Sequence, residues 1–362
     1  MRPVRGMRFI ALVAAGGLTL AVTACGEKPT ENSGGTAASP TGKAYTACMV
    51  TDQGGLDDKS FNASAWLGLQ NAKAKNPAIE IKNVQSKTEA DYEPNLNGYV
   101  QQKCDFILAV GGLMSTALEK VAKANPNQQF GIVDAGSTLP NVHTMQYRTE
   151  QAAFLAGYLA GGMTKSNKVA TYGGMKIPPV TIFMDGYADG VAEYNKAKSK
   201  NVQVLGWNKE KQTGTFTEDF DAPDKGKAKS DAFVAQGADI IFPVAGKTGT
   251  GTASAAKASG GKYAVIWVDQ DGCVSNAENC PAFITTVVKN VTDAVTDAVV
   301  KGAGGEDLKA PYVGTLANNG VSLAPYHDYE SKVPAELKAE IDKLKADIIA
   351  GTINVNSPAA PK

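Results

Sequence analysis

The sequence predicts an α/β fold of two lobes, each a parallel sheet flanked by helices. Short apolar runs of strand length alternate with helical patterns along most of the chain, as in repeated strand–helix units. These units fall into two successive blocks, which indicates two lobes. Hydrophobic residues make up 43% of the chain, which is enough for sizeable cores.

The first block covers residues 44–147. Its apolar runs have the length and the β-branched content of strands, and the segments between them have helical spacing. The expected strands are 44–50, 79–83, 105–110, 129–134 and 143–146, and the expected helices lie near 60–75, 90–102 and 114–124.

The second block begins with a helix at 147–163, whose small residues allow close packing. The runs KVATYGG, QVLGWN, DIIFPVAG and YAVIWVD predict strands, with helices expected near 183–198, 224–236 and 250–258. Segment 283–301 joins a strand to a helix. Segment 333–351 has the pattern of an amphipathic helix that stops at Gly351.

Residues 1–24 have the pattern of a signal peptide, because three arginines precede an uncharged run. That run is short for a membrane span, which needs ~20 apolar residues. It ends in VTAC, which resembles a bacterial lipobox and predicts lipidation of Cys25. A plain signal peptide cut elsewhere, or an uncleaved anchor, is the alternative. Residues 25–43 would then be a flexible tether rich in Gly, Ser, Thr and Pro.

The charge of the chain is balanced, with 36 Lys and Arg against 36 Asp and Glu. Removal of the three signal-peptide arginines leaves 33 against 36, a net charge of −3. Nucleic-acid binders cluster positive charge on one face, and the basic runs here, at 196–200 and 225–229, are typical of solvated helix faces. We therefore expect no nucleic-acid partner.

Motifs of catalysis and metal binding are missing from the sequence. There is no GxSxG or HExxH, and His143 and His327 have no metal-ligand spacing. The run GKTGTGT at 246–252 is similar to the end of a P-loop, but Ile241 stands where its first glycine belongs. Three aspartates between 219 and 224 lack the EF-hand spacing. We expect no enzymatic activity, no cofactor and no metal.

The stretch VTDQGGLDDKSFN, at 50–62, predicts a strand, a glycine-containing loop and a helix start. Asp57 or Asp58 can cap this helix, whose N-terminus favours carboxylates and bound polar groups. In open α/β sheets, ligands bind outside the carboxyl ends of the strands, where this loop lies. Phe61 is then either buried in an ordinary turn between strand and helix or offered to a ligand.

The segment GGLDDKSFN resembles the GG-[IL]-x-DKSFN signature of the basic membrane protein family, lipoprotein substrate-binding subunits of ABC importers, many of which bind nucleosides. Further similar blocks include FGIVDAGS, YRTEQAAFLAGYLAG, GADIIFPVAGKTG and VIWVDQD. The resemblance implies a two-lobed type I periplasmic-binding-protein-like fold, with lobes that close by hinge motion. Lobe 1 (44–147) would be completed by about 283–315, and lobe 2 (148–282) by about 316–355.

The resemblance also implies a ligand site, carried over residue by residue. The expected ligand-binding residues are Asp52, Phe61, Asn62, Asp134, Phe216, Gly246, Asp269 and Lys289. Phe61 and Phe216 would cover the two faces of a nucleobase, although Phe220 could turn inward in place of Phe216. Asp52 and Gly246 would line the pocket.

The polar residues of this set would form hydrogen bonds with the edge of the base and with the sugar. Asn62 and Asp134 are expected to contact the base, and Asp269 and Lys289 to hold the ribose hydroxyls. Lys289 could instead simply begin a surface helix.

Four cysteines remain if Cys25 is lipidated, and an even number in an exported protein suggests disulfides. Cys273 and Cys280 close a short polar loop and are expected to pair. Cys48 and Cys104 lie on or beside strands that neighbour each other in a 2-1-3 strand order, so they can also pair. Reduced core cysteines are the alternative for this second pair.

The function that the resemblance implies is that of a solute-binding lipoprotein on the outer face of the cell membrane. It would bind a nucleoside, by expectation a purine nucleoside, and deliver it to the permease subunits of an ABC importer. A membrane-tethered sensor or adhesion lipoprotein with the same fold is the alternative.

Overall fold

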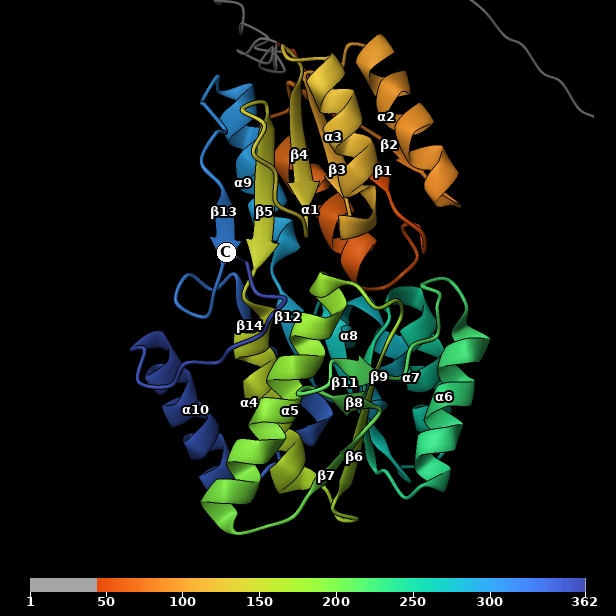
Figure 1. The fold of residues 1–362 in the computed structure, drawn as a ribbon, viewed down its shortest axis with the longest axis vertical. Coiled ribbons are helices and arrows are strands. Elements are labelled where there is room, and N and C mark those ends of the chain that lie inside the picture. Colours follow the sequence, from red (N-terminus) through yellow and green to blue (C-terminus); the bar gives the residue numbers. More distant parts are fainter. Residues whose placement is uncertain (1–43, 362) are drawn as a thin grey trace, which may run out of the picture. The chain divides into compact units, whose positions relative to one another are not determined.

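The first sheet of the computed structural model, which describes residues 44–361, is wholly parallel (Figure 1). Its strand order, β13-β5-β4-β3-β1-β2, contains the 2-1-3 arrangement. Its strands are β1 (Tyr45–Thr51), β2 (Ile79–Gln85), β3 (Phe106–Val110), β4 (Gln129–Val133), β5 (Val142–Tyr147) and β13 (Tyr312–Gly314). The strands expected in the first block are confirmed. β13 is an addition, because three residues are too few to give a period.

Two pairs of helices cover this sheet, one on each face (Figure 1). They are α1 (Phe61–Lys75) with α9 (Val291–Ala303), and α2 (Tyr92–Gln101) with α3 (Ser115–Ala124). Hydroxyl groups join the first pair: Thr292 Oγ1 donates to the Ser64 carbonyl and Thr296 Oγ1 to the Gly68 carbonyl. A segment from late in the chain therefore completes the first lobe.

The second sheet has the order β14-β12-β11-β10-β6-β7 and is parallel except for the edge strand β14, which runs antiparallel to β12. Its strands are β6 (Lys168–Gly173), β7 (Gln203–Leu205), β10 (Ile240–Val244), β11 (Ala264–Asp269), β12 (Phe283–Lys289) and β14 (Val321–Leu323). The run QVLGWN, expected as one strand, splits at Gly206, whose φ of 83° breaks the extended backbone. Beyond it, β8 (Trp207–Asn208) pairs with β9 (Thr213–Gly214).

The helices of the second lobe pack mainly in pairs, α4 against α5 and α6 against α7, with α10 against α4. They are α4 (Thr149–Met163), α5 (Pro178–Lys198), α6 (Pro223–Ala235), α7 (Gly249–Ala258), the short α8 (Gly272–Ser275) and α10 (Ala335–Ile349). α5 begins five residues earlier than expected, because Pro178 and Pro179 occupy its first turn, where proline is well tolerated. This start brings α5 to the cleft between the lobes.

The segment 283–315, expected to complete lobe 1, is divided between the lobes. β12 belongs to the second sheet, where it pairs with β11, and the chain enters lobe 1 only with α9. The boundary therefore lies at Asn290 and not at 283. The reason is that the apolar run of β12 continues the second sheet beside β11, whereas the Thr-rich face of α9 fits α1.

Three chain crossings connect the lobes, and hydrogen bonds tie them to one another. The crossings lie at Arg148, at Asn290 and between Gly314 and Val321. The Arg148 amide donates to the Gly314 carbonyl (2.8 Å), and the Asn290 amide donates to the Gly320 carbonyl (2.9 Å). These bonded crossings form the hinge that the fold needs for closure.

Both expected disulfides are present, Cys48–Cys104 and Cys273–Cys280. The first joins β1 to Cys104, two residues before β3, its neighbour in the sheet. The expected signal peptide (1–24), tether (25–43) and lipidated Cys25 lie outside the described residues. In residues 44–361, no helix combines the length and the apolar character that a membrane span requires.

Candidate functional site

A narrow cavity lies between the lobes at the carboxyl ends of the strands, with about 60 Å³ of room for the centres of water-sized molecules. Clefts between two lobes are a common place for small-molecule sites. Of the eight residues expected to bind a ligand, all but Phe216 line the cavity: Asp52, Phe61, Asn62, Asp134, Gly246, Asp269 and Lys289. Seven residues that the resemblance implied thus lie around one cavity.

Lys289 is the charge at the centre of this cavity. Its Nζ lies 2.7 Å from Asp134 Oδ2 of the first lobe and 3.4 Å from Asp269 Oδ1 of the second, and all three side chains are buried. The ammonium also lies 4.3 Å from the centroid of the Phe61 ring. Lys289 is therefore a bridge between the lobes and not the start of a surface helix.

The electrostatics of this trio favour the charged form of the lysine. Burial acts to lower the pKa of Lys289, but Asp134 and Asp269 raise it above its ordinary value. Burial raises the pKa of both carboxyl groups, and the Lys289 charge opposes that shift. Asp134 and Asp269 also share a left-handed backbone, with φ of 68° and 67°. Such backbone is uncommon for residues with a side chain, and it turns both carboxylates towards the lysine.

Asp52 and Asn62 form the polar wall of the first lobe. Asn62 Nδ2 donates to Asp52 Oδ1 (2.9 Å), while Asn62 Oδ1 is buried and has no hydrogen-bonding partner within residues 44–361. Asp58 holds this wall in place, because its carboxylate accepts the backbone amides of Ser60, Asn62 and Ala63 at the start of α1. Of the two candidate caps, Asp58 therefore acts as the cap.

Two of these carboxyl groups have strongly raised pKa values. Burial raises the pKa of Asp52 to about 8, despite the hydrogen bond from Asn62. Burial likewise raises the pKa of Asp58 to about 6, despite its three amide donors. At neutral pH, Asp52 can therefore donate a hydrogen bond to a ligand as well as accept one.

We expect the thermal stability of the ligand-free protein to fall as pH rises from about 4 to about 8. Both carboxyl groups ionise at higher pH when folded than when unfolded, so the folded chain binds more protons in this window. Asp52→Asn, which mimics the protonated form, should flatten the decline in calorimetric Tm. The exposed Asp57→Asn is the matched control and should keep the wild-type slope. Identical slopes for all three proteins would contradict the assignment.

The aromatic wall differs from the expectation at one residue. Phe61 lines the cavity from lobe 1, but the partner from lobe 2 is Phe220 and not Phe216. Phe216 is held by a backbone bridge to Gly173, and its ring meets Trp207 edge-on at 6.1 Å. Phe220, four residues later, lies over Gly174, whose missing side chain leaves room for the ring. Phe216 therefore packs in the second lobe.

The first turn of α5 supplies an apolar wall that sequence reasoning missed. Ile177, Pro179, Val180 and Phe183 line the cavity, with Val244 and Val268 from the strands opposite. The signal was the Pro-Pro pair at 178–179, which marks a helix start at the cleft. Such a wall excludes water and strengthens the polar contacts inside.

The rim of the cavity is joined across the lobes at Lys59, whose φ is 58°. Its carbonyl accepts hydrogen bonds from Trp267 Nε1 (3.3 Å) and Ser275 Oγ (2.7 Å) of the second lobe. Ser275 belongs to the loop that the Cys273–Cys280 disulfide closes. That loop, which has no counterpart in the recognised motifs, thus contacts the DKSFN segment directly.

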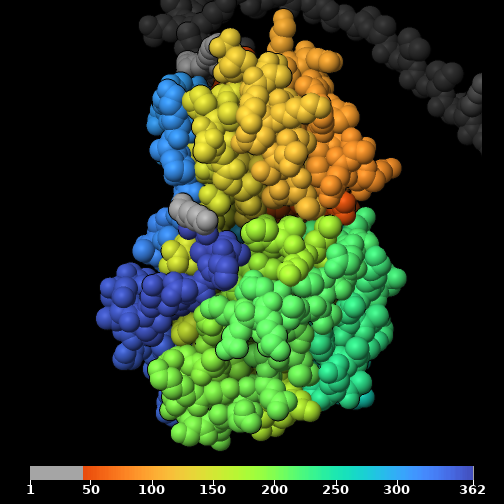
Figure 2. Space-filling view, in the orientation of Figure 1, coloured from red at the N-terminus to blue at the C-terminus, as the bar shows by residue number. Residues whose placement is uncertain are grey.

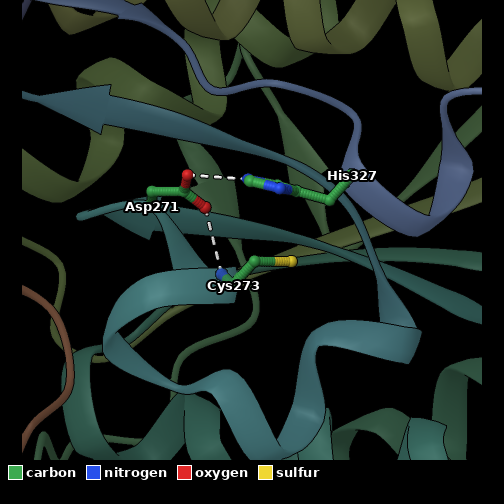
Figure 3. Close-up of side chains that lie close together, drawn as sticks. All are labelled: Asp271, Cys273 and His327. Atoms are coloured by element: carbon green, nitrogen blue, oxygen red, sulfur yellow. Dashed lines mark hydrogen bonds and ion pairs between the residues drawn. The ribbon is translucent and has the colours of Figure 1, made fainter.

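A group of polar side chains lies beside this loop: Asp271 and Cys273 at its start, and His327 from a later segment of the chain (Figure 3). His327 Nε2 lies 2.7 Å from Asp271 Oδ2, and Asp271 Oδ1 accepts the Cys273 amide (3.0 Å). The potential ligand atoms of these three residues lie within 4.8 Å of one another. Because the Cys273 sulfur is bonded to Cys280, only two could bind a metal, fewer than the three or four protein ligands of zinc sites. The group is better described as a brace of the loop.

Comparisons with known proteins show the family and the fold of the chain. A family model described as ABC transporter substrate-binding protein PnrA-like matches residues 45–357. The chain is 32% identical over 365 residues to the CD4+ T-cell-stimulating antigen of Listeria innocua, with 96% of each chain covered. It is 32% identical to the ABC transporter nucleoside-binding protein BmpA of Lactococcus lactis, over 86% of this chain and 89% of that protein.

Two further matches concern anchoring and fold. An uncharacterized lipoprotein of Pyrococcus horikoshii is 31% identical over 84% of this chain and 74% of its own. An ABC transporter solute-binding protein of Aeropyrum pernix has a similar structure, with a TM-score of 0.78 and 25% identity over 87% of this chain and 94% of its own. The chain therefore belongs to the family of PnrA-like ABC transporter substrate-binding proteins, as its basic membrane protein motifs indicated.

Proposed function

We propose that this substrate-binding protein takes up a nucleoside, with a preference for purines, and delivers it to the permease subunits of an ABC importer. The observation that carries the proposal is the combination, in one cavity, of two aromatic rings from opposite lobes with a buried lysine between two carboxylates. A nucleobase is flat, so Phe61 and Phe220 can cover its faces. The polar groups are left for its edge and its sugar.

The proposed roles follow from the donors and acceptors available. Asn62 and Asp134 contact the edge of the base, and the unpartnered Asn62 Oδ1 is an acceptor for a base N–H. Asp269 and Lys289 hold the ribose: a sugar hydroxyl donates to the carboxylate and accepts from the ammonium. Among the described residues, Asp269 Oδ1 has only the longer, 3.4 Å ion pair with Lys289 and accepts no hydrogen bond, so it can also accept such a hydroxyl. The two carboxylates disfavour a phosphate, so nucleotides should bind less tightly than nucleosides.

The name of the Lactococcus lactis relative supports this substrate class, since that protein is described as nucleoside-binding. Mass spectrometry of small molecules released from the denatured, purified protein would identify the bound ligand directly. Calorimetry with guanosine, inosine, adenosine and their free bases then tests the sugar contacts. Buried polar groups left without a partner cost ~1–3 kcal/mol each, so nucleosides should bind more tightly than bases. Free bases that bind equally well would remove Asp269 and Lys289 from their roles.

We further propose that the protein is a lipoprotein on the outer face of the cell membrane. Cys25 ends the uncharged run of the signal sequence, and residues 26–43 can act as a tether for the folded body. Lipidation would place the binding body close to the importer that receives its ligand.

Cys25→Ser should release the protein from the membrane fraction into the medium or the soluble fraction. Stable anchoring takes at least two lipid chains, and loss of the thiol removes the site of both cleavage and lipidation. A matched control deletes residues 27–43 and keeps Cys25; it should remain with the membrane. Retention of the Cys25→Ser protein in membranes, with unchanged electrophoretic mobility, would count against a lipid anchor.

A further inference from the structure

The segment that follows α10 is anchored to the second lobe at three successive residues. The Val355 carbonyl accepts from Arg148 Nη2 (3.2 Å), and the Asn356 carbonyl accepts from Lys209 Nζ (2.5 Å). Ser357 Oγ donates to Asp185 Oδ2 (2.6 Å). These three successive hydrogen bonds fix the path of residues 355–357 along the second lobe.

Asp185 is a prepared anchor and not an incidental contact. It is fully buried on α5, and its Oδ1 accepts hydrogen bonds from Trp207 Nε1 and Gln212 Nε2, both at 2.9 Å. Ser357 supplies the partner of the other oxygen. A buried carboxylate with every oxygen bonded holds its partners firmly, because leaving one unpaired is costly.

Beyond this anchor the chain enters a second crevice between the lobes. Ala359 and Pro361 line it together with Gln146 and Tyr147 of lobe 1 and Ile182 of lobe 2. Figure 2 shows the dark-blue C-terminal segment over the junction of the yellow and green lobes. Ala359 and Ala360 also pack against the hydrophobic core.

This second crevice adjoins the ligand cavity, because Asp134 and Pro179 line both. Its walls include polar groups: the hydroxyls of Tyr147 and Thr149 are buried without a hydrogen-bonding partner among the described residues. Polar and apolar groups thus line the crevice, which shares Asp134 with the ligand cavity. The family model ends at residue 357, so Ala359 and Pro361 lie beyond the region that it matches.

We propose that residues 357–361, which we call the C-terminal strap, close this second entrance to the ligand cavity and slow the release of the bound molecule. The strap is fixed to lobe 2 by Asp185 and fills a space that lobe 1 also lines. Opening of the lobes would therefore move the lobe 1 wall, formed by Gln146 and Tyr147, away from the strap. The claim that the strap slows ligand release rests on the proposed nucleoside function. The claim that the strap closes the crevice is independent of that function.

The first test measures release with the probe nucleoside that binds the full-length protein best. A protein that ends at Asn356, and the Ser357→Ala variant, should release it roughly tenfold faster in stopped-flow fluorescence, the change expected from loss of one hydrogen bond to a charged group. Ser357→Thr keeps the hydroxyl and should restore slow release. Equal release rates in wild type and the shortened protein would overturn the role in retention.

The second test needs no ligand. Hydrogen exchange of the ligand-free proteins should show faster exchange of the amides of Gln146, Tyr147 and Ile182 in the shortened protein and in Ser357→Ala. The exchange rates of the α6 amides should be unchanged, because no residue of α6 lines the crevice. Unaltered exchange at the crevice would overturn the seal itself. Failure of all nucleosides to bind the wild type would instead refute the proposed function and leave this result to decide on the strap.

Discussion

Replacement of Lys289 by methionine should abolish nucleoside binding and strongly destabilise the protein. The substitution leaves Asp134 and Asp269 buried without their common counter-charge. Removal of one partner of a buried ion pair costs ~3–5 kcal/mol of folding free energy. The loss should shrink as pH falls, because protonation neutralises the two carboxyl groups. Chemical denaturation across a pH series, together with calorimetry of binding, measures both effects.

Two further variants separate the contributions to this result. Lys301→Met removes an exposed lysine on α9 that pairs with Asp297 and should leave stability and affinity near wild type. Adding Asp134→Asn to Lys289→Met should restore part of the stability without restoring affinity, because it removes one uncompensated charge but no ligand contact is regained. If Lys289→Met is as stable as the wild type, the ion pairs of the buried trio do not contribute to the free energy of unfolding.

Phe61→Ala should weaken nucleoside binding by roughly 5- to 150-fold, since base–aromatic stacking is worth ~1–3 kcal/mol per base. Phe61 is only half-buried, so the fold should survive. Phe61→Trp should be tolerated better than Phe61→Leu, because a flat π-face matters more here than volume. Titration calorimetry and thermal melting on the same preparations give affinity and stability side by side.

Phe216 provides the matched control for this clamp. Phe216→Ala removes a phenyl ring from the loop that also carries Phe220, but outside the cavity, and should lower stability through lost packing on Trp207 while affinity holds. Phe220→Ala should behave like Phe61→Ala. A large loss of stability in Phe61→Ala, with unchanged affinity in the folded fraction, would make Phe61 a core residue and remove the main physical support for a nucleoside ligand.

Much of this architecture is readable from local sequence because buried parallel strands are short continuous apolar runs. FILAV and IIFPV are buried at every position, and each is β-strand where the runs predict it. Asp134 and Asp269 come at the ends of such runs, so the topology of a parallel sheet suffices to bring them to the same cleft. Their meeting on Lys289 follows because β12 lies beside β11.

What the sequence could not settle depended on tertiary contacts. Phe216 and Phe220 occupy one loop, and the choice between them is made by a backbone bridge to Gly173 and by the space over Gly174. β13 and β14 are three residues each, and they form only because neighbouring strands offer free edges. The sequence of the C-terminal strap has neither helical nor strand periodicity in its apolar residues. Its path is set by the hydrogen bond to Asp185, which is far away in sequence.

The position of Lys289 has a mechanical consequence. It stands one residue before Asn290, where the chain crosses between the lobes, so the charged bridge acts almost at the pivot of any opening motion. The contacts on the Lys59 carbonyl lie at the rim, farther from the pivot, so the same rotation displaces them by a larger distance. A rotation that barely stretches the central ion pairs would already separate Ser275 from Lys59. Opening of the protein should therefore begin at its edge, while the grip on the ligand's polar centre is the last to be lost.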